Sequence, residues 1–167
     1  MSQNNSGELT EIQLVVFKLG SEEYGVPITQ VQEINRLMTP TKIPQSPPFV
    51  EGIINLRGKI IPVIDLKKRF NLPLVDHTAN TRIIVINIGE NTVGVVVDAV
   101  TEVLRLPMSS LEPPPPMISS ISVDYLKGVG KVGDRLLILL DLDKILTEKE
   151  KEQLAATEAC AKDTVKF

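Results

Sequence analysis

One sequence unit occurs twice in this chain, and this duplication limits the fold more than any other feature. Residues 14–37 align without a gap to residues 83–106, so that Gly20, Gly25 and Glu33 match Gly89, Gly94 and Glu102, 69 positions later. A second pair follows, because residues 52–70 align with residues 128–146 at a spacing of 76 positions. The spacing grows because the second copy has a longer loop, residues 107–123. Two copies with the same order of landmarks predict two similar small subdomains.

Each copy has the pattern of short β-strands joined by tight turns. Residues 12–19 and 82–88 are rich in Val, Ile and Phe, and both runs end at a glycine-containing turn. Residues 53–56 and 59–64 flank a reversal at Arg57-Gly58, and residues 129–132 and 136–140 flank Gly133-Asp134. Apolar runs such as residues 136–140 indicate strands that are covered on both faces. Four to five strands per copy are too few for a sandwich but suit a small barrel, so the sequence predicts an all-β fold of two tandem barrels that share an interface.

Helices are predicted only at the ends of strands. Asp65 and Asp141 stand where a strand stops, and an aspartate there caps a short helix by accepting hydrogen bonds from its first backbone N–H groups. Residues 147–150 read Thr-Glu-Lys-Glu, which fits a capping box that opens a final helix.

Composition excludes several classes of protein. The 167 residues carry 18 basic and 21 acidic side chains, a net charge of −3, so the chain lacks the basic excess of a nucleic-acid-binding protein. The N-terminus has no signal-peptide pattern, and no apolar run is long enough to cross a membrane. The single cysteine, Cys160, cannot form an internal disulfide. The sequence therefore predicts a cytoplasmic protein without direct membrane insertion.

No motif supports catalysis. Residues 128–133 match G-x-G-x-x-G, but they precede a strand and not the helix that a dinucleotide needs, and no Walker loop occurs. His77, the only histidine, lies in a polar connector and has no catalytic or metal-ligating partners. Asp141 and Asp143 lack the further oxygen ligands that calcium requires. We expect no enzyme activity, no cofactor and no metal.

Two features are not explained by the fold alone. The hairpin sequence Asn55-Leu56-Arg57-Gly58 needs its glycine for backbone freedom, but it does not need an arginine. A guanidinium suits a partner's carboxylates or carbonyls, although a solvated turn residue is an equally good interpretation. Glu33 recurs as Glu102, and a repeated acid is either structural or part of a recognition surface, with the repetition favouring the structural role.

An ordered set of segments runs through both copies. The segments are Phe17-Lys18-Leu19-Gly20 with Tyr24-Gly25, Val31-Gln32-Glu33-Ile34, Asn55-Leu56-Arg57-Gly58, Asp65-Leu66, Val95-Val96-Val97-Asp98, and Gly128 with Gly133-Asp134-Arg135. This ordered set resembles the CheW family of bacterial chemotaxis coupling proteins. The resemblance implies two intertwined five-stranded barrels of the Src-homology-3 kind. It places a CheW-like domain at residues 11–150, with subdomains mainly at 11–75 and 82–146 that exchange strands at their ends. Residues 1–10 would be a disordered tail, and residues 147–167 a C-terminal helix and tail.

The same resemblance implies a function and a site. It implies a non-catalytic adaptor, monomeric when free, that couples methyl-accepting chemoreceptors to the regulatory domain of the histidine kinase CheA, in receptor arrays at the inner face of the membrane. By position, Val31, Glu33 and Arg57 would contact a partner, while Asn55, Leu56 and Gly58 would shape the hairpin. The second copy has Lys131-Val132-Gly133-Asp134 at the hairpin, so the two hairpins are not equivalent. The rival hypothesis is a small-ligand-binding barrel, which would need a roomy cavity with converging polar groups.

Overall fold

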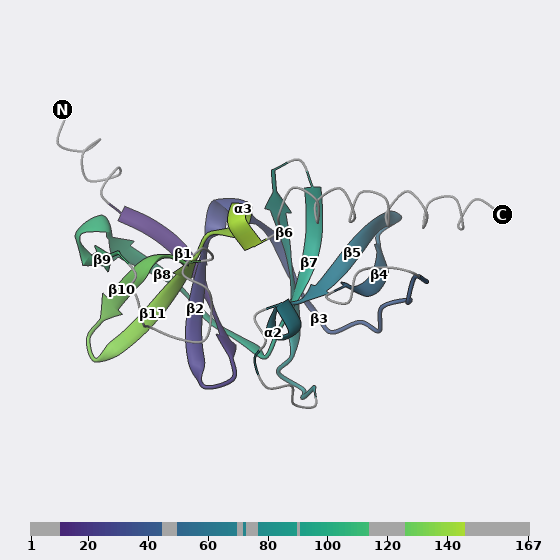
Figure 1. Cartoon of the computed structure of the whole chain (residues 1–167), viewed down its shortest axis with the longest axis horizontal. Helices are drawn as coiled ribbons and strands as arrows, with labels where there is room; N and C mark the ends of the chain where they lie inside the picture. The colour runs from purple at the N-terminus through teal and green to yellow at the C-terminus, as the bar shows by residue number, and fades with distance from the viewer. Residues whose placement is uncertain are drawn as a thin grey trace.

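The structure is a computed structural model that describes residues 11–44, 50–69, 72, 77–89, 91–113 and 126–145. This part of the chain is mainly β, which confirms the predicted all-β class, and its strands form two sheets that lie side by side (Figure 1). The six-stranded sheet contains, in spatial order, β8 (Ala99–Pro107), β1 (Glu11–Leu19), β2 (Glu22–Pro27), β11 (Arg135–Leu140), β10 (Leu126–Val132) and β9 (Leu111–Glu112). The five-stranded sheet contains β3 (Val31–Arg36), β6 (Arg82–Ile88), β7 (Asn91–Val97), β5 (Lys59–Asp65) and β4 (Val50–Leu56).

Short helices connect the strands. The 3-10 helix η1 (Ile28–Gln30) leads from β2 to β3, and η2 (Met108–Ser110) leads from β8 to β9. The α-helices α2 (Leu66–Arg69) and α3 (Leu142–Ile145) follow β5 and β11. The predicted N-terminal tail and the predicted C-terminal helix at 147–167 lie outside the described residues.

Each sheet combines strands from both sequence copies. β1 and β2 of the first copy belong to the sheet that holds β8 to β11, and β6 and β7 of the second copy belong to the sheet that holds β3 to β5. Strand pairs of two kinds join the copies: β2 with β11 and β5 with β7 are parallel, whereas β1 with β8 and β3 with β6 are antiparallel. The remaining strand pairs are antiparallel and lie within one copy. Neither copy therefore supplies a complete sheet by itself.

Three apolar clusters fill the described part of the molecule. The central core lies between the sheets and draws side chains from both, including Phe17 and Tyr24, whose stacked rings have centroids 6.0 Å apart. A second cluster, the five-stranded-sheet core, consists of Ile54, Ile61, Val63, Ile83, Val85 and Val96. A third, the six-stranded-sheet core, consists of Leu14, Val16, Leu106, Leu137 and Leu139. Runs such as 14–17, 83–86 and 137–140 are wholly buried because each feeds a core on either face of its sheet, as the continuous apolar pattern predicted.

Repeated glycines mark where a neighbouring backbone comes too close for a side chain. Thr41, beyond the end of β3, exchanges two backbone hydrogen bonds with Ile53 of β4, of 2.8 and 2.9 Å, so the chain after one edge strand reaches the other edge strand. A Cβ on Gly52 would stand 2.3 Å from the Thr41 carbonyl oxygen, and one on Gly128, its repeat counterpart, 2.9 Å from the Glu112 carbonyl oxygen. The aligned glycines are therefore explained by close backbone approach.

The two predicted helix caps are confirmed. Asp65 Oδ1 accepts hydrogen bonds from the backbone N–H groups of Lys67 (2.9 Å) and Lys68 (3.4 Å), and Asp141 Oδ1 accepts one from Asp143 (3.2 Å). These bonds satisfy donors that the first turn of a helix would otherwise leave without partners.

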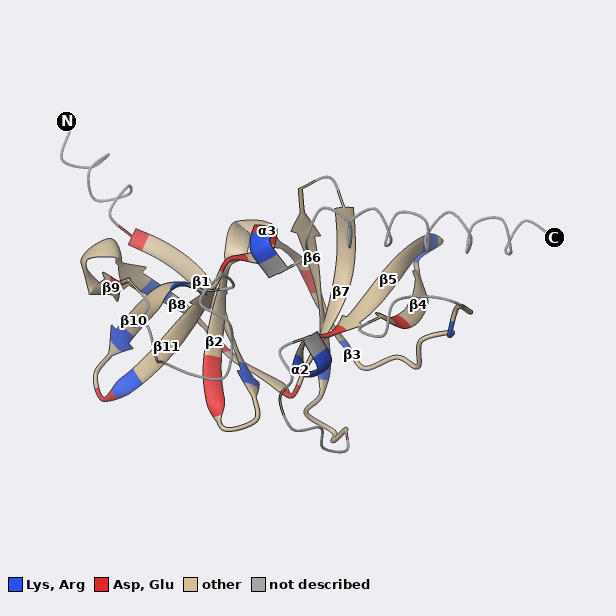
Figure 2. Cartoon of the chain, viewed as in Figure 1, with Lys and Arg blue, Asp and Glu red and all other residues tan. Residues whose placement is uncertain are grey.

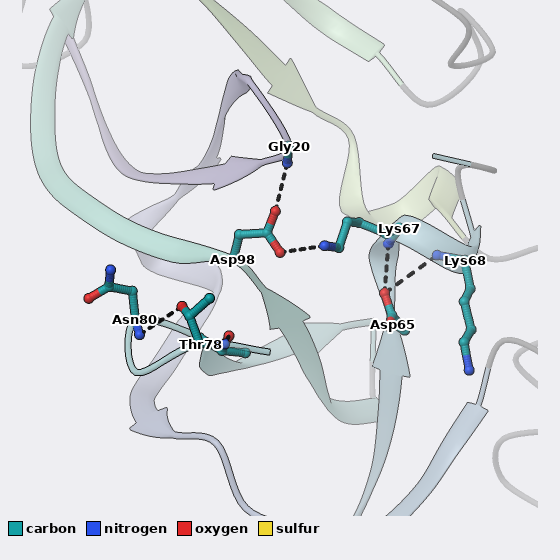
Figure 3. A network of polar contacts seen from close by, with 8 residues as sticks. Gly20, Asp65, Lys67, Lys68, Thr78, Asn80 and Asp98 are labelled. Carbon is teal, nitrogen blue, oxygen red and sulfur yellow. Dashed lines mark hydrogen bonds and ion pairs between the residues drawn. The ribbon is translucent and has the colours of Figure 1, made fainter. Parts of the chain in front are cut away.

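Asp98 ties the two sheets together at the bend between β7 and β8 (Figure 3). Its Oδ2 accepts a hydrogen bond from the backbone N–H of Gly20 (2.7 Å), in the β1–β2 turn of the six-stranded sheet. Its Oδ1 lies 2.6 Å from Nζ of Lys67, a buried side chain of α2 beside the five-stranded sheet. A buried ammonium needs such a counter-charge, because its transfer from water is costly. No sequence pattern indicated this ion pair.

Candidate partner-binding site

The predicted hairpin at residues 55–58 has an unusual backbone. Leu56 pairs with Lys59, so Arg57 and Gly58 are the two turn residues, with φ of 53° and 86°. Positive φ at both positions is the pattern of a type I′ turn, whose twist matches that of the flanking strands. The Asn55 side-chain oxygen accepts a hydrogen bond from the Gly58 N–H (2.7 Å) and so holds the turn. Arg57 is the one non-glycine residue with positive φ in the part of the chain that the structure describes, and a long side chain seldom adopts this conformation.

Glu33 of β3 holds the Arg57 guanidinium. The two side chains form an ion pair, with the Arg57 side chain 71% exposed and that of Glu33 24% exposed. The hydrogen bond from Arg57, followed by one from the Asn35 side-chain amide (3.0 Å), keeps the pKa of the Glu33 carboxyl below its ordinary range. The same contact raises the pKa of Arg57. The pair therefore stays ionised and presents a fixed guanidinium beside the edge strand β3.

The other two predicted residues pack against two different cores. Leu56 packs against the five-stranded-sheet core, and Val31 packs against the central core. Glu33 and Val31 lie on opposite faces of β3 because the strand contains a β-bulge: Val31 pairs with Ile86, Glu33 pairs with the adjacent Val85, and Gln32 is the extra residue between them. The structure thus gathers Glu33, Asn55, Arg57 and Gly58 at one place and sets Val31 on the other face.

The second copy makes a similar ion pair from a different position. Glu102, the counterpart of Glu33, accepts a hydrogen bond from Arg135 (2.8 Å), which also forms two bonds of 2.9 Å to Glu23. By the repeat alignment, Arg135 matches Lys59, whereas Arg57 matches Gly133, whose φ of 60° suits a glycine. The hydrogen bond from Arg135 lowers the pKa of Glu23. The repeated glutamate is therefore ion-paired in both copies, which supports its structural role.

Arg57 remains unexplained by the fold, because the second copy satisfies its glutamate without an arginine in the turn. Sequence reasoning missed both Arg135 as a partner of Glu102 and the positive φ of Arg57. The available signal was the turn alignment, in which arginine stands in the place of a glycine. Lys and Arg positions, like Asp and Glu positions, occur along the strands of both sheets (Figure 2).

The structure also contains a surface groove of about 710 Å³. Its lining combines Ile12, Pro27 and Ile28 with the exposed side chains of Gln13, Arg105 and Lys127, among others. A small-molecule site usually buries most of its ligand, whereas a groove lined by exposed side chains leaves a ligand in contact with water. The groove therefore gives no support to the ligand-binding alternative.

In the part of the chain that the structure describes, no cluster of three His, Cys, Asp or Glu side chains could hold a metal ion, and no helix is long and apolar enough to cross a membrane.

Comparison with known proteins decides the family. Residues 13–150 match the family described as CheW-like domain. The chain belongs to this family. It is similar to the chemotaxis protein CheW of Klebsiella aerogenes, with 41% identity over 87% of each chain, and to that of Bacillus subtilis, with 37% identity over 85% of this chain and 90% of the other. The crystal structure of the scaffolding protein TtCheW from Thermoanaerobacter tengcongensis superposes with a TM-score of 0.77 and 42% identity, covering 83% of this chain and 90% of that one. Membership of the CheW-like family supports the predicted role as a chemotaxis adaptor.

Proposed function

We propose that this adaptor couples methyl-accepting chemoreceptors to the regulatory domain of the histidine kinase CheA, and that Arg57 and Glu33 form the centre of one partner-binding surface. Val31, Asn55, Leu56 and Gly58 belong to this proposed surface as its supports. We further propose that the chain acts in the cytoplasm, at receptor arrays, and that it catalyses no reaction. The relatives named above are chemotaxis proteins, and the solved one is called a scaffold, which supports these assignments.

The observation that carries the proposal is the backbone at Arg57. A non-glycine residue at positive φ is unfavourable, and the second copy has glycine at this position with the same sign of φ. The turn would therefore be at least as stable with glycine. Its exposed guanidinium, held in place by Glu33, offers a planar set of donors to a partner's carboxylates or carbonyls. An unfavourable conformation at an exposed charged residue is what a binding role explains and the fold does not.

The test is to remove the guanidinium without unfolding the protein. Arg57→Ala and Arg57→Gly both remove the charge, but the glycine also relieves the backbone, so Arg57→Gly should melt at least as high as Arg57→Ala. Both variants should bind the partners about 30-fold or more weakly, because truncating a charged anchor at an interface has effects of that order. Both should fail to support receptor-dependent activation of CheA in a reconstituted array.

The matched control is Lys68→Ala. Lys68 of α2 also forms an exposed ion pair, with Glu51 at 2.5 Å, but it lies outside the proposed surface. This variant should couple receptor and kinase normally. Normal coupling by both Arg57 variants would show that the proposed surface is wrong.

A further inference from the structure

Asn87 of β6 makes the contacts that hold the start of β3. Its side-chain oxygen accepts hydrogen bonds from Gln32 Nε2 (2.7 Å) and from Thr92 Oγ1 (3.3 Å). Its backbone carbonyl accepts a third, from Gln30 Nε2 (3.3 Å). Asn87 thus reaches Gln30 of η1 and Gln32 of β3, which lie 57 and 55 positions earlier in the sequence.

Gln32 is the extra residue of the β-bulge between Val31 and Glu33. In a regular strand, residues two apart share a face, so without the bulge Val31 and Glu33 would point to the same side. The bulge turns Glu33 toward the face that carries Arg57 and leaves Val31 on the central core. A bulge interrupts the hydrogen-bond ladder, and β3 is an edge strand, so a side-chain contact is needed to fix its geometry.

The second copy contains the same bulge but holds it differently. Thr101, the counterpart of Gln32, is the extra residue between Val100 and Glu102, and its hydroxyl donates to the backbone carbonyl of Val16 (3.3 Å). The counterpart of Asn87 is Lys18, whose side chain has no oxygen that could accept a hydrogen bond. The fold therefore forms the bulge without an asparagine, and Asn87 is a feature of the five-stranded sheet, which also carries Arg57.

We propose that Asn87 is a positioning residue for the partner-binding surface: by accepting the hydrogen bond from Gln32, it fixes the bulge that places Val31 and Glu33 on opposite faces of β3. This inference rests on the proposed function of the Glu33–Arg57 surface. It adds a residue from the other sequence copy that touches no partner and acts through Gln32.

Two substitutions separate the role of the Asn87 oxygen as a hydrogen-bond acceptor from the packing of the Asn87 side chain. Asn87→Leu keeps the branched shape of the side chain and removes the oxygen, whereas Asn87→Asp keeps an oxygen that can accept from both Gln32 and Thr92. In the free protein, hydrogen exchange at the amides of residues 31–33 should become about tenfold faster in Asn87→Leu, and exchange at the counterpart residues 100–102 should not change. Asn87→Asp should exchange like the parent. Unchanged exchange at residues 31–33 in Asn87→Leu would overturn the inference without any partner being present.

Binding provides the second measurement, with the CheA regulatory domain and a chemoreceptor tip fragment from the same bacterium as probes. Asn87→Leu should bind about tenfold more weakly to the probe that contacts this surface, and Asn87→Asp should bind like the parent. Thr92→Val, which removes the other donor to the same oxygen, should bind normally. Gln32→Ala combined with Asn87→Leu should lose no more affinity than either change alone, because both remove one interaction.

The outcomes distinguish the two proposals. If the parent binds and Asn87→Leu binds equally well, or if Asn87→Asp is as weak as Asn87→Leu, the positioning role of Asn87 is wrong and the function stands. If the parent binds neither probe, the proposed function is wrong, and the exchange measurement still decides whether Asn87 fixes the bulge.

Discussion

Alanine at Gly52 should be among the most damaging single-methyl changes in this fold. The added Cβ would lie 2.3 Å from the Thr41 carbonyl oxygen and 2.7 Å from its carbon, so the two segments must move apart. This movement breaks the two backbone hydrogen bonds between Thr41 and Ile53, each worth about 1 kcal/mol net. The φ of 144° at Gly52 adds about 1–3 kcal/mol for an L side chain. We expect Gly52→Ala to lower the free energy of unfolding by about 3–5 kcal/mol.

Two other glycines serve as matched controls. Gly128, the repeat counterpart, has a single tight contact, with the Glu112 carbonyl oxygen at 2.9 Å, and we expect Gly128→Ala to cost about 1–2 kcal/mol. Gly133 has φ of 60° and no atom within 4 Å of an added Cβ, so Gly133→Ala should cost about 1 kcal/mol from backbone strain alone.

Urea unfolding followed by circular dichroism measures all three variants against the parent. Because both changes strain the backbone, the difference between Gly52→Ala and Gly133→Ala reports mainly the cost of separating Thr41 from Ile53. If the two variants unfold within about 1 kcal/mol of each other, the close approach at Gly52 does not stabilise the fold, and the explanation of the repeated glycines fails.

Three further predictions concern charge and catalysis. Asp98→Ala should lower the free energy of unfolding by about 3 kcal/mol, more than Lys67→Met does, because it leaves the buried Lys67 ammonium without its counter-charge. Urea unfolding of both variants gives the order of the two effects, and the reverse order would contradict this account. The pKa of Glu23 is lowered by the hydrogen bond from Arg135, so its contribution to stability is present above the ordinary carboxyl range and is lost as the pH falls through the lowered value. The gap in melting temperature between the parent and Arg135→Gln should therefore be widest near neutral pH and narrow below about pH 4, and a gap independent of pH would refute the ion pair as its cause. Incubation of the chain alone with radiolabelled ATP should yield neither hydrolysis nor phosphoryl transfer, and stoichiometric self-phosphorylation would contradict an adaptor role.

Local sequence rules predicted the structure correctly where a feature depends only on residues nearby in the chain. The capping aspartates Asp65 and Asp141 could be predicted because an N-cap depends on the next few backbone N–H groups alone. The strand at Arg82–Ile88 and the reversals at Arg57-Gly58 and Gly133-Asp134 could be predicted from β-branched runs and glycine turns in the same way. The conformations of these caps, this strand and these turns depend little on the rest of the fold.

The candidate site was predicted only in part, because its interactions cross between distant segments. The resemblance to the CheW family named Glu33 and Arg57, but their ion pair joins residues 24 positions apart, and no local pattern shows it. Arg135 holds Glu102 from the position that matches Lys59, so transferring contacts along the repeat alignment would have chosen the wrong residue. The proposed role of Asn87 could not be predicted from the sequence, because it depends on a bulge that arises from the pairing of β3 with β6.

The duplication, the β class, the family and the absence of a recognisable catalytic motif could be predicted without the structure, because these depend on composition, periodicity and ordered motifs within each copy. The way in which the copies share their strands could not be predicted and became visible in the folded chain. The parallel pairings of β2 with β11 and β5 with β7 place strands of one copy in the sheet of the other, and the central core then draws apolar side chains from both sheets. Hydrophobic burial has no direction of its own, so the apolar pattern fixes which residues are buried but not which copy covers them. That choice depends on strand pairing across the whole chain, and it brings Asn87 of the second copy beside Gln32 of the first.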